Sequence, residues 1–404
     1  MYARSFLGAC LACWCKSDRW PWQSNTEIWI NKLTRRSPMP RKKVLCIIGT
    51  RPEVIKMAPV VRTLRESPGL DVSVLSSGQH RELLVPLFKW FEINVDADLN
   101  VMTANQTLAE LTARIMCRLE QNFSGSTPDL VLAQGDTTTV FCTALSCFYK
   151  NIPFAHVEAG LRTFDVQNPF PEEFNRVAVG RLAQLHFCPT VRARENVLAE
   201  HAQPQSVHLT GNTVIDALRF TTEKLKSQPS REFDHDILLT AHRRENFGQP
   251  LLEIFDAILD LCREFPAIKL LYPVHPNPNV RGVAMQKLGN HAQIKIVDPL
   301  DYPDLVAAMQ RASIILTDSG GIQQEAPALA KPVLVLRTAT ERPEAVELGV
   351  AKIVGPIRNE IVLQTRRLLL DNAHYEQMAR GGSPYGDGHA AESIRGIVRE
   401  YLNL

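Results

Sequence analysis

From residue 43 onward, short apolar runs alternate with longer segments whose polar and apolar spacing is compatible with helices. The apolar runs are nearly continuous in Val, Ile and Leu, which is typical of parallel strands covered on both faces. They predict strands at 44–48, 72–75, 130–133, 154–157 and 185–188, and again at 237–240, 269–272, 294–297, 314–316 and 333–336. Regular alternation of strand and helix predicts right-handed βαβ units and therefore an open α/β sheet in each half of the chain.

The chain has 404 residues, more than one hydrophobic core usually serves, so two domains are expected. The junction is placed near residues 209–213, which gives an N-terminal domain at 39–209 and a C-terminal, ligand-binding domain at 210–389. The last stretch, 390–404, is amphipathic and is expected to pack back onto the first domain. Polar motifs that follow strands in both halves predict a site in a cleft between the domains.

Residues 1–38 differ from the rest because they are rich in Trp and Cys and lack periodicity. The apolar segment 6–12 is too short for a signal peptide, and a lipoprotein motif at 7–10 lacks a preceding apolar segment. Met39 opens a stretch that resembles a natural start. We therefore expect residues 1–38 to be a disordered extension outside the fold.

Composition limits which kinds of partner the protein can have and in which cellular compartment it is expected. A net charge of +2, without a dense Lys/Arg run, argues against nucleic acid. No stretch approaches the roughly 18 to 20 apolar residues that span a bilayer. Most of the nine cysteines lie singly in apolar contexts, which predicts reduced thiols in a cytoplasmic protein. Cys10-x-x-Cys13 lacks a second ligand pair, so no metal is expected.

The segment 317–325 is the most informative motif of the chain. It follows an apolar strand and combines Ser319, the pair Gly320 and Gly321, and the acid Glu325. Glycines allow the backbone close to a ligand, and a following helix offers free N–H groups to phosphate. Glu325, one turn later, could accept hydrogen bonds from a ribose diol. A structural turn would explain the glycines but not the acid, so we predict a nucleoside diphosphate site.

Two cations follow the first strand, at Arg51 and Lys56. Pointed into the cleft, either could stabilise a leaving diphosphate; the alternative is a solvated basic turn. The sequence contains neither a Walker loop nor a Gly-x-Gly-x-x-Gly fingerprint, which argues against bound NAD. No cofactor is therefore expected.

Three acids follow further strands of the first half. Asp136 could be a cleft acid or the N-cap of the next helix, whereas Glu158 has no evident capping role. Glu172, next to Glu173 after a Pro-rich bend, could face the cleft. The alternatives are that one of the two acids merely favours the start of the helix, or that both stay exposed. Together Asp136, Glu158 and Glu172 could converge on one substrate carbon as acid and base, in an order that the sequence leaves open.

Three residues of the second half complete the candidates. His242 follows the first strand there and could meet a phosphate or a departing oxygen, or else bond a loop carbonyl as a structural histidine. Arg342 could clamp a diphosphate. Glu344 could orient that arginine or form a surface ion pair.

In this order and spacing the motifs GTRPE, QHR, GDTTT, HVEAGLRT, AHRREN, DSGGIQ and TERPE resemble the non-hydrolysing UDP-N-acetylglucosamine 2-epimerases. The resemblance covers about residues 43–404. It implies a glycosyltransferase-B-like fold of two Rossmann-like domains facing across a cleft, a homodimer, and interconversion of UDP-GlcNAc and UDP-ManNAc without NAD or metal. The family's cleft residues carry over to Arg51, Lys56, Asp136, Glu158, Glu172, His242, Ser319, Glu325 and Arg342.

The resemblance also bears on regulation. Many members bind a second UDP-GlcNAc as an activator, and Gln79 and Arg244 match the motifs of that site. Glu82 replaces the Gln of some activator-dependent members, and Gln324 stands where many members have Glu.

The chemistry of the sugar favours elimination. The C2 hydrogen has no neighbouring carbonyl, so direct deprotonation is hard, whereas loss of UDP as a base removes that proton gives 2-acetamidoglucal. A UDP-sugar glycosyltransferase or a hydrolysing epimerase on the same fold, and a nucleotide-sugar sensor without turnover, are the alternatives.

Overall fold

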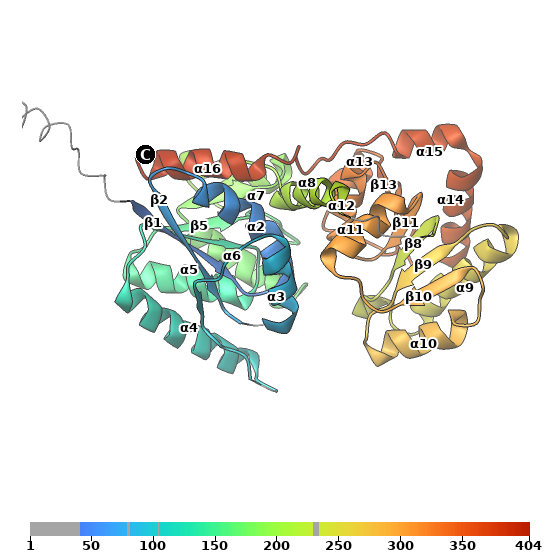
Figure 1. The fold of residues 1–404 in the computed structure, drawn as a ribbon, viewed down its shortest axis with the longest axis horizontal. Coiled ribbons are helices and arrows are strands. Elements are labelled where there is room, and N and C mark those ends of the chain that lie inside the picture. Colours follow the sequence, from blue (N-terminus) through green and yellow to red (C-terminus); the bar gives the residue numbers. More distant parts are fainter. Residues whose placement is uncertain (1–40, 79–80, 104, 229–233) are drawn as a thin grey trace, which may run out of the picture. The chain divides into compact units, whose positions relative to one another are not determined.

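The computed structural model describes residues 41–78, 81–103, 105–228 and 234–404. Two parallel sheets dominate it (Figure 1). The predicted extension at 1–38 lies outside the described residues. The segment Lys42–Leu404 forms one compact unit that contains both sheets.

The first sheet has seven strands in the order β3-β2-β1-β4-β5-β6-β7, and every pair is parallel. Its strands are β1 (Lys42–Ile48), β2 (Leu70–Ser76), β3 (Ala97–Asp98), β4 (Leu130–Gln134), β5 (Phe154–Val157), β6 (Leu185–Cys188) and β7 (Val207–Leu209). The register sets Val44 opposite Val72 on one side and opposite Leu130 on the other.

The second sheet has six strands in the order β10-β9-β8-β11-β12-β13, again all parallel. Its strands are β8 (Ile237–Thr240), β9 (Leu270–Pro273), β10 (Ile294–Val297), β11 (Ile314–Thr317), β12 (Val333–Val335) and β13 (Ala351–Ile353). All ten predicted strands are therefore present. The three that the pattern missed, β3, β7 and β13, have two or three residues and lie at or near sheet edges, where a hydrophobic run is too short to register.

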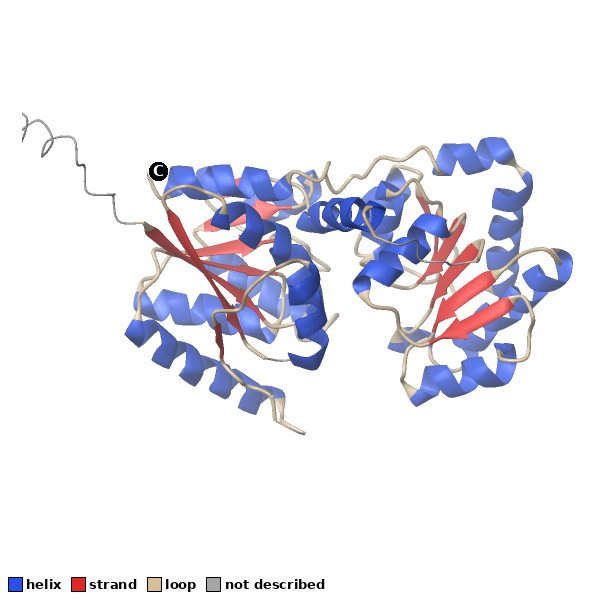
Figure 2. Cartoon of the chain, viewed as in Figure 1, coloured by secondary structure: helices blue, strands red, loops and turns tan. Residues whose placement is uncertain are grey.

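Helices cover both faces of each sheet (Figure 2). In chain order they are α2 (Arg51–Arg65), α3 (Arg81–Trp90), α4 (Leu108–Gly125), α5 (Thr138–Lys150), α6 (Glu172–Leu182), α7 (Val191–Ala199), α8 (Thr213–Lys226), α9 (Gln249–Glu264), α10 (Pro278–Leu288), α11 (Tyr302–Arg311), α12 (Ile322–Ala328), α13 (Pro343–Glu347), α14 (Arg358–Leu370), α15 (Asn372–Met378) and α16 (Ala390–Tyr401), with short 3₁₀ helices η1 (Pro204–Ser206) and η2 (Arg244–Asn246). Among the described residues, none of these helices is long and apolar enough to cross a membrane.

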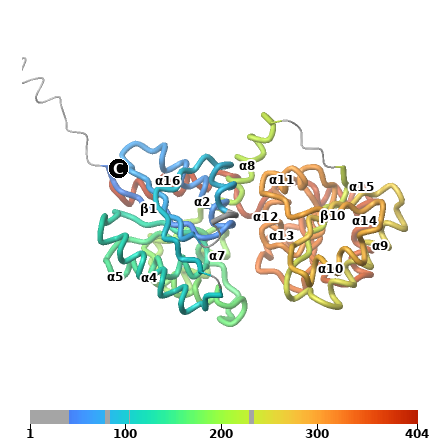
Figure 3. The backbone as a smooth tube through the Cα atoms, turned by 60° about the horizontal axis from the view of Figure 1, so that its bottom comes forward, coloured from blue at the N-terminus to red at the C-terminus, as the bar shows by residue number. Residues whose placement is uncertain are grey.

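The last helix, α16, lies beside α2 (Figure 3). Its amphipathic pattern buries Ile394 and Val398, and Arg399 donates to the hydroxyl of Ser67 and the carbonyl of Pro68 after α2. Helix α8 in turn contacts α2, α11, α12 and α16. One hydrophobic cluster accordingly contains side chains of both sheets. A second cluster contains side chains of the second sheet, and a third contains side chains of the first sheet.

The strand orders fix where a ligand site can form. In each sheet the chain runs outward from a central pair, β1/β4 in the first and β8/β11 in the second, so the loops after these strands diverge in opposite directions. Ligands of open α/β sheets bind at such switch points, beyond the carboxyl ends of the strands. The predicted α/β class is confirmed, and the candidate motifs follow these four strands and their neighbours β5 and β12. The domain limits at 209 and 389 stay a prediction.

Candidate active site

Lys56 and Glu158 form a buried ion pair at the centre of the candidate site. The Lys56 Nζ lies 2.7 Å from Oε1 and 2.5 Å from Oε2 of Glu158, and both side chains are almost fully buried. Gln134 at the end of β4 donates to Oε2, and Asn212 at the start of α8 donates to Oε1 at 2.7 Å. The alternative of a solvated basic turn is therefore wrong for Lys56.

Burial by itself would raise the pKa of Glu158, but the charges of Lys56 and Arg342 and the bonds from Lys56 and Asn212 outweigh it and lower the pKa. The carboxylate consequently stays ionised at neutral pH. The backbone of Glu158 is strained, with φ of 62°, a conformation that costs a non-glycine residue about 1 kcal/mol or more. The hydrogen bonds and the ion pair hold it there.

Asp136 follows β4 and pairs with Arg176 of α6 at 2.8 Å. Asn175 donates to its carbonyl, so the β4 loop and α6 are tied together. The N-cap of α5 is Thr137, whose hydroxyl accepts from the amide of Val140, and the capping alternative for Asp136 is therefore wrong.

The two adjacent acids of α6 have different environments. Glu173 is buried, accepts from the amides of Thr163 and Phe164, and pairs with Arg176, so its role is structural. Glu172, the first residue of α6, is half-buried, and its buried Oε2 has no hydrogen-bond partner among the described residues. Glu172 is therefore the member of the pair that remains a candidate.

His242 follows β8 and is supported by Asp318 at the end of β11. Its Nδ1 lies 3.3 Å from Oδ1 of Asp318, whose other oxygen accepts from the amides of His242 and Arg243 at 2.8 Å. The ring stacks on His275 at 5.5 Å. Burial, only partly opposed by the charge of Asp318, lowers the pKa of His242, which favours a neutral imidazole at physiological pH. The ring thus lies against a carboxylate, in place of the loop carbonyl of the structural alternative.

Gly320 packs directly against the guanidinium of Arg342. A Cβ at this position would lie 2.5 Å from Nη1 and 3.0 Å from Cζ, so only glycine leaves the arginine undisturbed. The Nε of Arg342 is buried and has no hydrogen-bond partner among the described residues, while its Nη1 lies 3.1 Å from Glu341. Ser319 is half-buried beside them. Helix α12 behind this loop is short, and Pro327 lies inside it.

Glu325 of α12 is buried and accepts from the hydroxyl of Tyr302 at 2.8 Å. Burial raises its pKa to about 7, although the bond from Tyr302 and the charges of Lys56 and Arg51 act in the opposite direction. Arg51 itself donates to the carbonyl of Leu300 at 3.1 Å. The cations after β1 thus lie close to the acid after β11.

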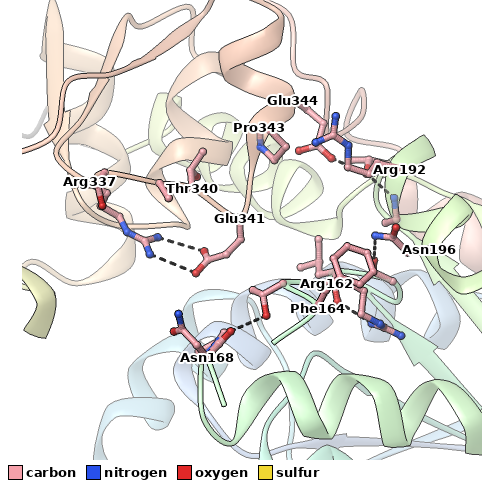
Figure 4. Close-up of a pocket in the computed structure, with 18 of the residues that line it drawn as sticks. Arg162, Phe164, Asn168, Arg192, Asn196, Arg337, Thr340, Glu341, Pro343 and Glu344 are labelled. Carbon is pink, nitrogen blue, oxygen red and sulfur yellow. Dashed lines mark hydrogen bonds and ion pairs between the residues drawn. The ribbon is translucent and has the colours of Figure 1, made fainter. Parts of the chain in front are cut away.

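A cavity of about 550 Å³ has Glu341, the partner of Arg342, in its wall (Figure 4). It is lined by the segment after β5 around Arg162 and Phe164, by the start of α7, and by the segment 337–344. Glu341 on its wall pairs with Arg337 and Arg342, whose charges hold its pKa at about 2 against the effect of burial. Thr190 donates to Glu344 at 2.9 Å, so a hydroxyl group is the partner of this acid.

None of the predicted catalytic acids lines this cavity, and we place the candidate site at the buried charges beside it. Among the described residues, no group of three or more His, Cys, Asp or Glu could hold a metal ion. Of the two predicted activator-site residues, Gln79 lies outside the described residues, and Arg244 is exposed in η2.

The sequence reasoning missed several residues of the cluster. Glu53 is buried, accepts from the amides of Gly49 and Thr50 and the hydroxyl of Thr137, and has a pKa raised by burial to about 7. Asn212, Tyr302 and Asp318 were also missed as functional residues. The acid in GTRPE and the Asp of DSGG were visible signals, whereas nothing local marks Asn212 or Tyr302, which reach the site only through the tertiary fold.

Comparison with known proteins identifies the family. A family model described as UDP-N-acetylglucosamine 2-epimerase matches residues 62–399. The chain is 46% identical over 364 residues to the UDP-N-acetylglucosamine 2-epimerase of Escherichia coli K12, covering 87% of this chain and 97% of the relative. It is 44% identical over 372 residues to that of Campylobacter jejuni, covering 88% and 97%.

Solved structures agree with these relatives. The UDP-GlcNAc 2-epimerase of Neisseria meningitidis bound to UDP-GlcNAc superimposes with a TM-score of 0.83 at 43% identity, covering 90% of this chain and 100% of that one. The S. aureus protein MnaA, in a co-structure with UDP, gives 0.82 at 45% identity, covering 90% and 97%. The chain therefore belongs to the UDP-N-acetylglucosamine 2-epimerase family.

Proposed function

We propose that this chain interconverts UDP-GlcNAc and UDP-ManNAc by elimination and re-addition of UDP. In the forward direction a carboxylate takes the C2 proton, the electron pair of the C–H bond forms the C1–C2 double bond, and the C1–O bond breaks with its electron pair on UDP. The product is 2-acetamidoglucal. Protonation of C2 on the opposite face and return of UDP to C1 give the epimer.

The buried, ionised carboxylate of Glu158 is the observation that carries this proposal. A proton acceptor for an unactivated C–H bond must be charged, desolvated and fixed, and Glu158 has a lowered pKa, is buried and is held by three side chains. Lys56 shares that carboxylate, so movement of Lys56 toward a diphosphate would raise the basicity of Glu158 as the sugar arrives. We assign proton removal to Glu158.

The opposite face of C2 requires a second proton carrier. Asp136 and Glu172 are the candidates. Asp136 follows β4 and Glu172 lies in the connection after β5, so both lie on segments that leave the carboxyl ends of neighbouring parallel strands. Arg176 and Asn175 join the Asp136 loop to α6, which begins at Glu172. The linkage supports a shared role for the two acids, and we assign them the protonation of C2.

The second sheet supplies the groups that bind UDP in this proposal. Arg342, which packs against Gly320, the neutral ring of His242 and Ser319 stabilise the diphosphate as it leaves. Arg51, which follows β1 of the first sheet, assists them. Glu325 accepts from the ribose diol. Closure of both halves around the glucal would exclude water and limit its escape.

The proposal extends to assembly and regulation. A homodimer is supported by the exposed aromatic side chains Phe148 and Tyr149 of α5 and Phe174 of α6, which a second copy would cover. Gln79 and Arg244 would contact an activating UDP-GlcNAc. A cytoplasmic location is supported by the free thiols of the described cysteines, most of them buried.

Proton NMR of the protein with UDP-GlcNAc in deuterated water tests the reaction. UDP-ManNAc with deuterium at C2 is the expected product, with a trace of free UDP marking glucal that has escaped. Free ManNAc with stoichiometric UDP would instead show a hydrolysing enzyme. An unchanged spectrum at high UDP-GlcNAc, sufficient to fill an activator site, would contradict the proposal and favour a transferase.

A further inference from the structure

Two connections link the sheets, and their backbones touch. The first runs from β7 to α8 through Gly211, and the second runs from α15 to α16 through Tyr385 and Gly386. A Cβ at Gly211 would lie 3.2 Å from the carbonyl of Tyr385 and 3.3 Å from the Cα of Gly386. Both glycines have positive φ, 85° and 121°. A side chain at either position would separate the two connections.

Asn212 lies at this crossing, and besides accepting from the amide of Ile215 it makes three further hydrogen bonds. Its backbone N–H donates to the carbonyl of Tyr385 at 2.6 Å, and its side-chain oxygen accepts from the amide of Val214 at 3.0 Å, which caps α8. The side-chain N–H₂ donates to Oε1 of Glu158 at 2.7 Å. The residue is 2% exposed, so water cannot replace these bonds at little cost.

Tyr385, on the second connection, contacts Arg342, the arginine proposed to bind the diphosphate. The hydroxyl of Tyr385, itself 1% exposed, donates to the carbonyl of Arg342 at 3.3 Å. The charge of Arg342 acts on the carboxylate of Glu158. A continuous series of hydrogen bonds therefore runs from the backbone of Arg342 through Tyr385 and Asn212 to the carboxylate of Glu158.

We propose that Asn212 is a positioning residue that couples the crossing between the two sheets to the Glu158 carboxylate. Any movement of the connections that accompanies UDP binding at Arg342 would then also shift the proton acceptor. This inference rests on the proposed function, because it assigns a positioning role for the reaction of Glu158. It explains why an amide stands here: Ser and Asp cap helices about as well as Asn, but only the Asn side chain can accept from the helix amide and also donate to a carboxylate at that reach.

Two substitutions separate positioning from capping. Asn212→Ser and Asn212→Asp both keep an N-cap acceptor, and neither keeps the amide donor to Glu158. We expect Asn212→Ser to lower kcat by about tenfold to a hundredfold with little change in KM, since a hydrogen bond to a charged group is lost. Loss of the donor should raise the pKa of Glu158, so the acid limb of the kcat–pH profile should move to higher pH in both variants. The movement should be larger in Asn212→Asp, because its carboxylate would face that of Glu158.

Asp371→Ser is the matched control, because Asp371 caps α15 through the amide of His374 on an exposed surface. It should leave kcat, KM and the pH profile unchanged. Wild-type kcat and an unmoved pH profile in both Asn212 variants would overturn the inference and show a cap alone. If Asn212→Ser fails to fold, the shift in Asn212→Asp decides the question.

Failure of the proposed function is visible separately, as a wild-type protein that turns over no UDP-GlcNAc. In that case the coupling is measured by a double-mutant cycle of Asn212→Ser and Glu158→Gln in thermal unfolding. Non-additive effects would support the link between the two residues, and additive effects would overturn it.

Discussion

The Nζ of Lys56 lies 2.5 Å from Oε2 of Glu158, although 102 positions separate the two residues in the chain. Lys56 comes from α2 after β1, and Glu158 follows β5, with β4 between the two strands. Both side chains are withdrawn from water, so removing either one would leave the other buried without its counter-charge.

Replacing the carboxylate tests its chemical role. Glu158→Gln is isosteric and can still accept a hydrogen bond from Lys56, so we expect UDP binding to be retained while turnover falls by a factor on the order of one hundred or more. Deuterium incorporation at C2 and calorimetric binding of UDP measure the two effects. Glu120→Gln is the control, since that acid forms an exposed pair with Lys150. Turnover at the wild-type rate in Glu158→Gln would remove Glu158 from the mechanism.

Removing the positive charge of Lys56 tests how much the buried ion pair contributes to the free energy of unfolding. Lys56→Met leaves Glu158 buried without its main counter-charge, which should lower the free energy of unfolding at pH 7–8 by about 3 kcal/mol. Because the folded-state pKa of Glu158 is depressed, the stability it contributes is present above its unfolded pKa and is lost as the pH falls. The difference between wild type and Lys56→Met should accordingly shrink toward pH 4.

Lys150→Met provides the exposed counterpart, through the partner Glu120, and should cost less than about 1 kcal/mol. Urea unfolding at several pH values measures both variants. An equal, pH-independent loss in the two would contradict the assigned burial of the Lys56–Glu158 charge pair.

The contribution of Glu325 to the free energy of unfolding should depend on pH with the opposite sign. Its pKa rises to about 7 in the folded protein from 4.5, so its contribution to stability is fully present below the unfolded pKa and is lost as the pH rises through the folded pKa. Relative to wild type, Glu325→Gln should gain up to about 3 kcal/mol between pH 4.5 and pH 8. Thermal or urea unfolding across that range measures the gain, and Glu223→Gln on the exposed face of α8 is the control. Parallel curves for wild type and Glu325→Gln would contradict it.

Gly320→Ala tests whether the packing of the Arg342 guanidinium against Gly320 is needed to bind the diphosphate. The added Cβ would lie 2.5 Å from Nη1, and the flexible arginine must move to admit it. The fold should survive, while KM for UDP-GlcNAc should rise by about tenfold or more, as expected when a charge-assisted contact is lost. Gly282→Ala in α10, where a Cβ meets nothing within 4 Å, should behave as wild type. An unchanged KM in Gly320→Ala would show that Arg342 does not contact the diphosphate.

The second proton carrier can be identified by comparing Asp136→Asn with Glu172→Gln. Loss of that group should stop re-protonation on one face, so the variant should release 2-acetamidoglucal and UDP while losing most of the epimer, with turnover lower by about a hundredfold. Proton NMR detects the glucal directly. Glu173→Gln is unsuitable as a control because Glu173 holds α6 through Arg176, and exposed Glu195→Gln on α7 serves instead. If neither Asp136→Asn nor Glu172→Gln changes the product ratio, both acids are excluded.

Much of the fold could be read from the sequence because parallel strands buried on both faces are written as local apolar runs. All ten predicted strands are present, and only strands of two or three residues escaped. The motifs after β1, β4, β5, β8 and β11 were recognisable because glycines and acids directly after buried strands are local signals. Their gathering near the switch points follows from the order of strands, which the alternating pattern allowed us to expect.

The sequence by itself determined the α/β class, ten of the thirteen strands and most of the polar residues at their ends, since these depend on contacts between near neighbours in the chain. The tertiary structure decided which of those residues meet. It paired Lys56 with Glu158, assigned the cap of α5 to Thr137 rather than Asp136, and brought Asn212 and Tyr385 together where the two connections cross. Such contacts depend on the packing of segments far apart in sequence, and no local pattern of residues encodes the distance between them.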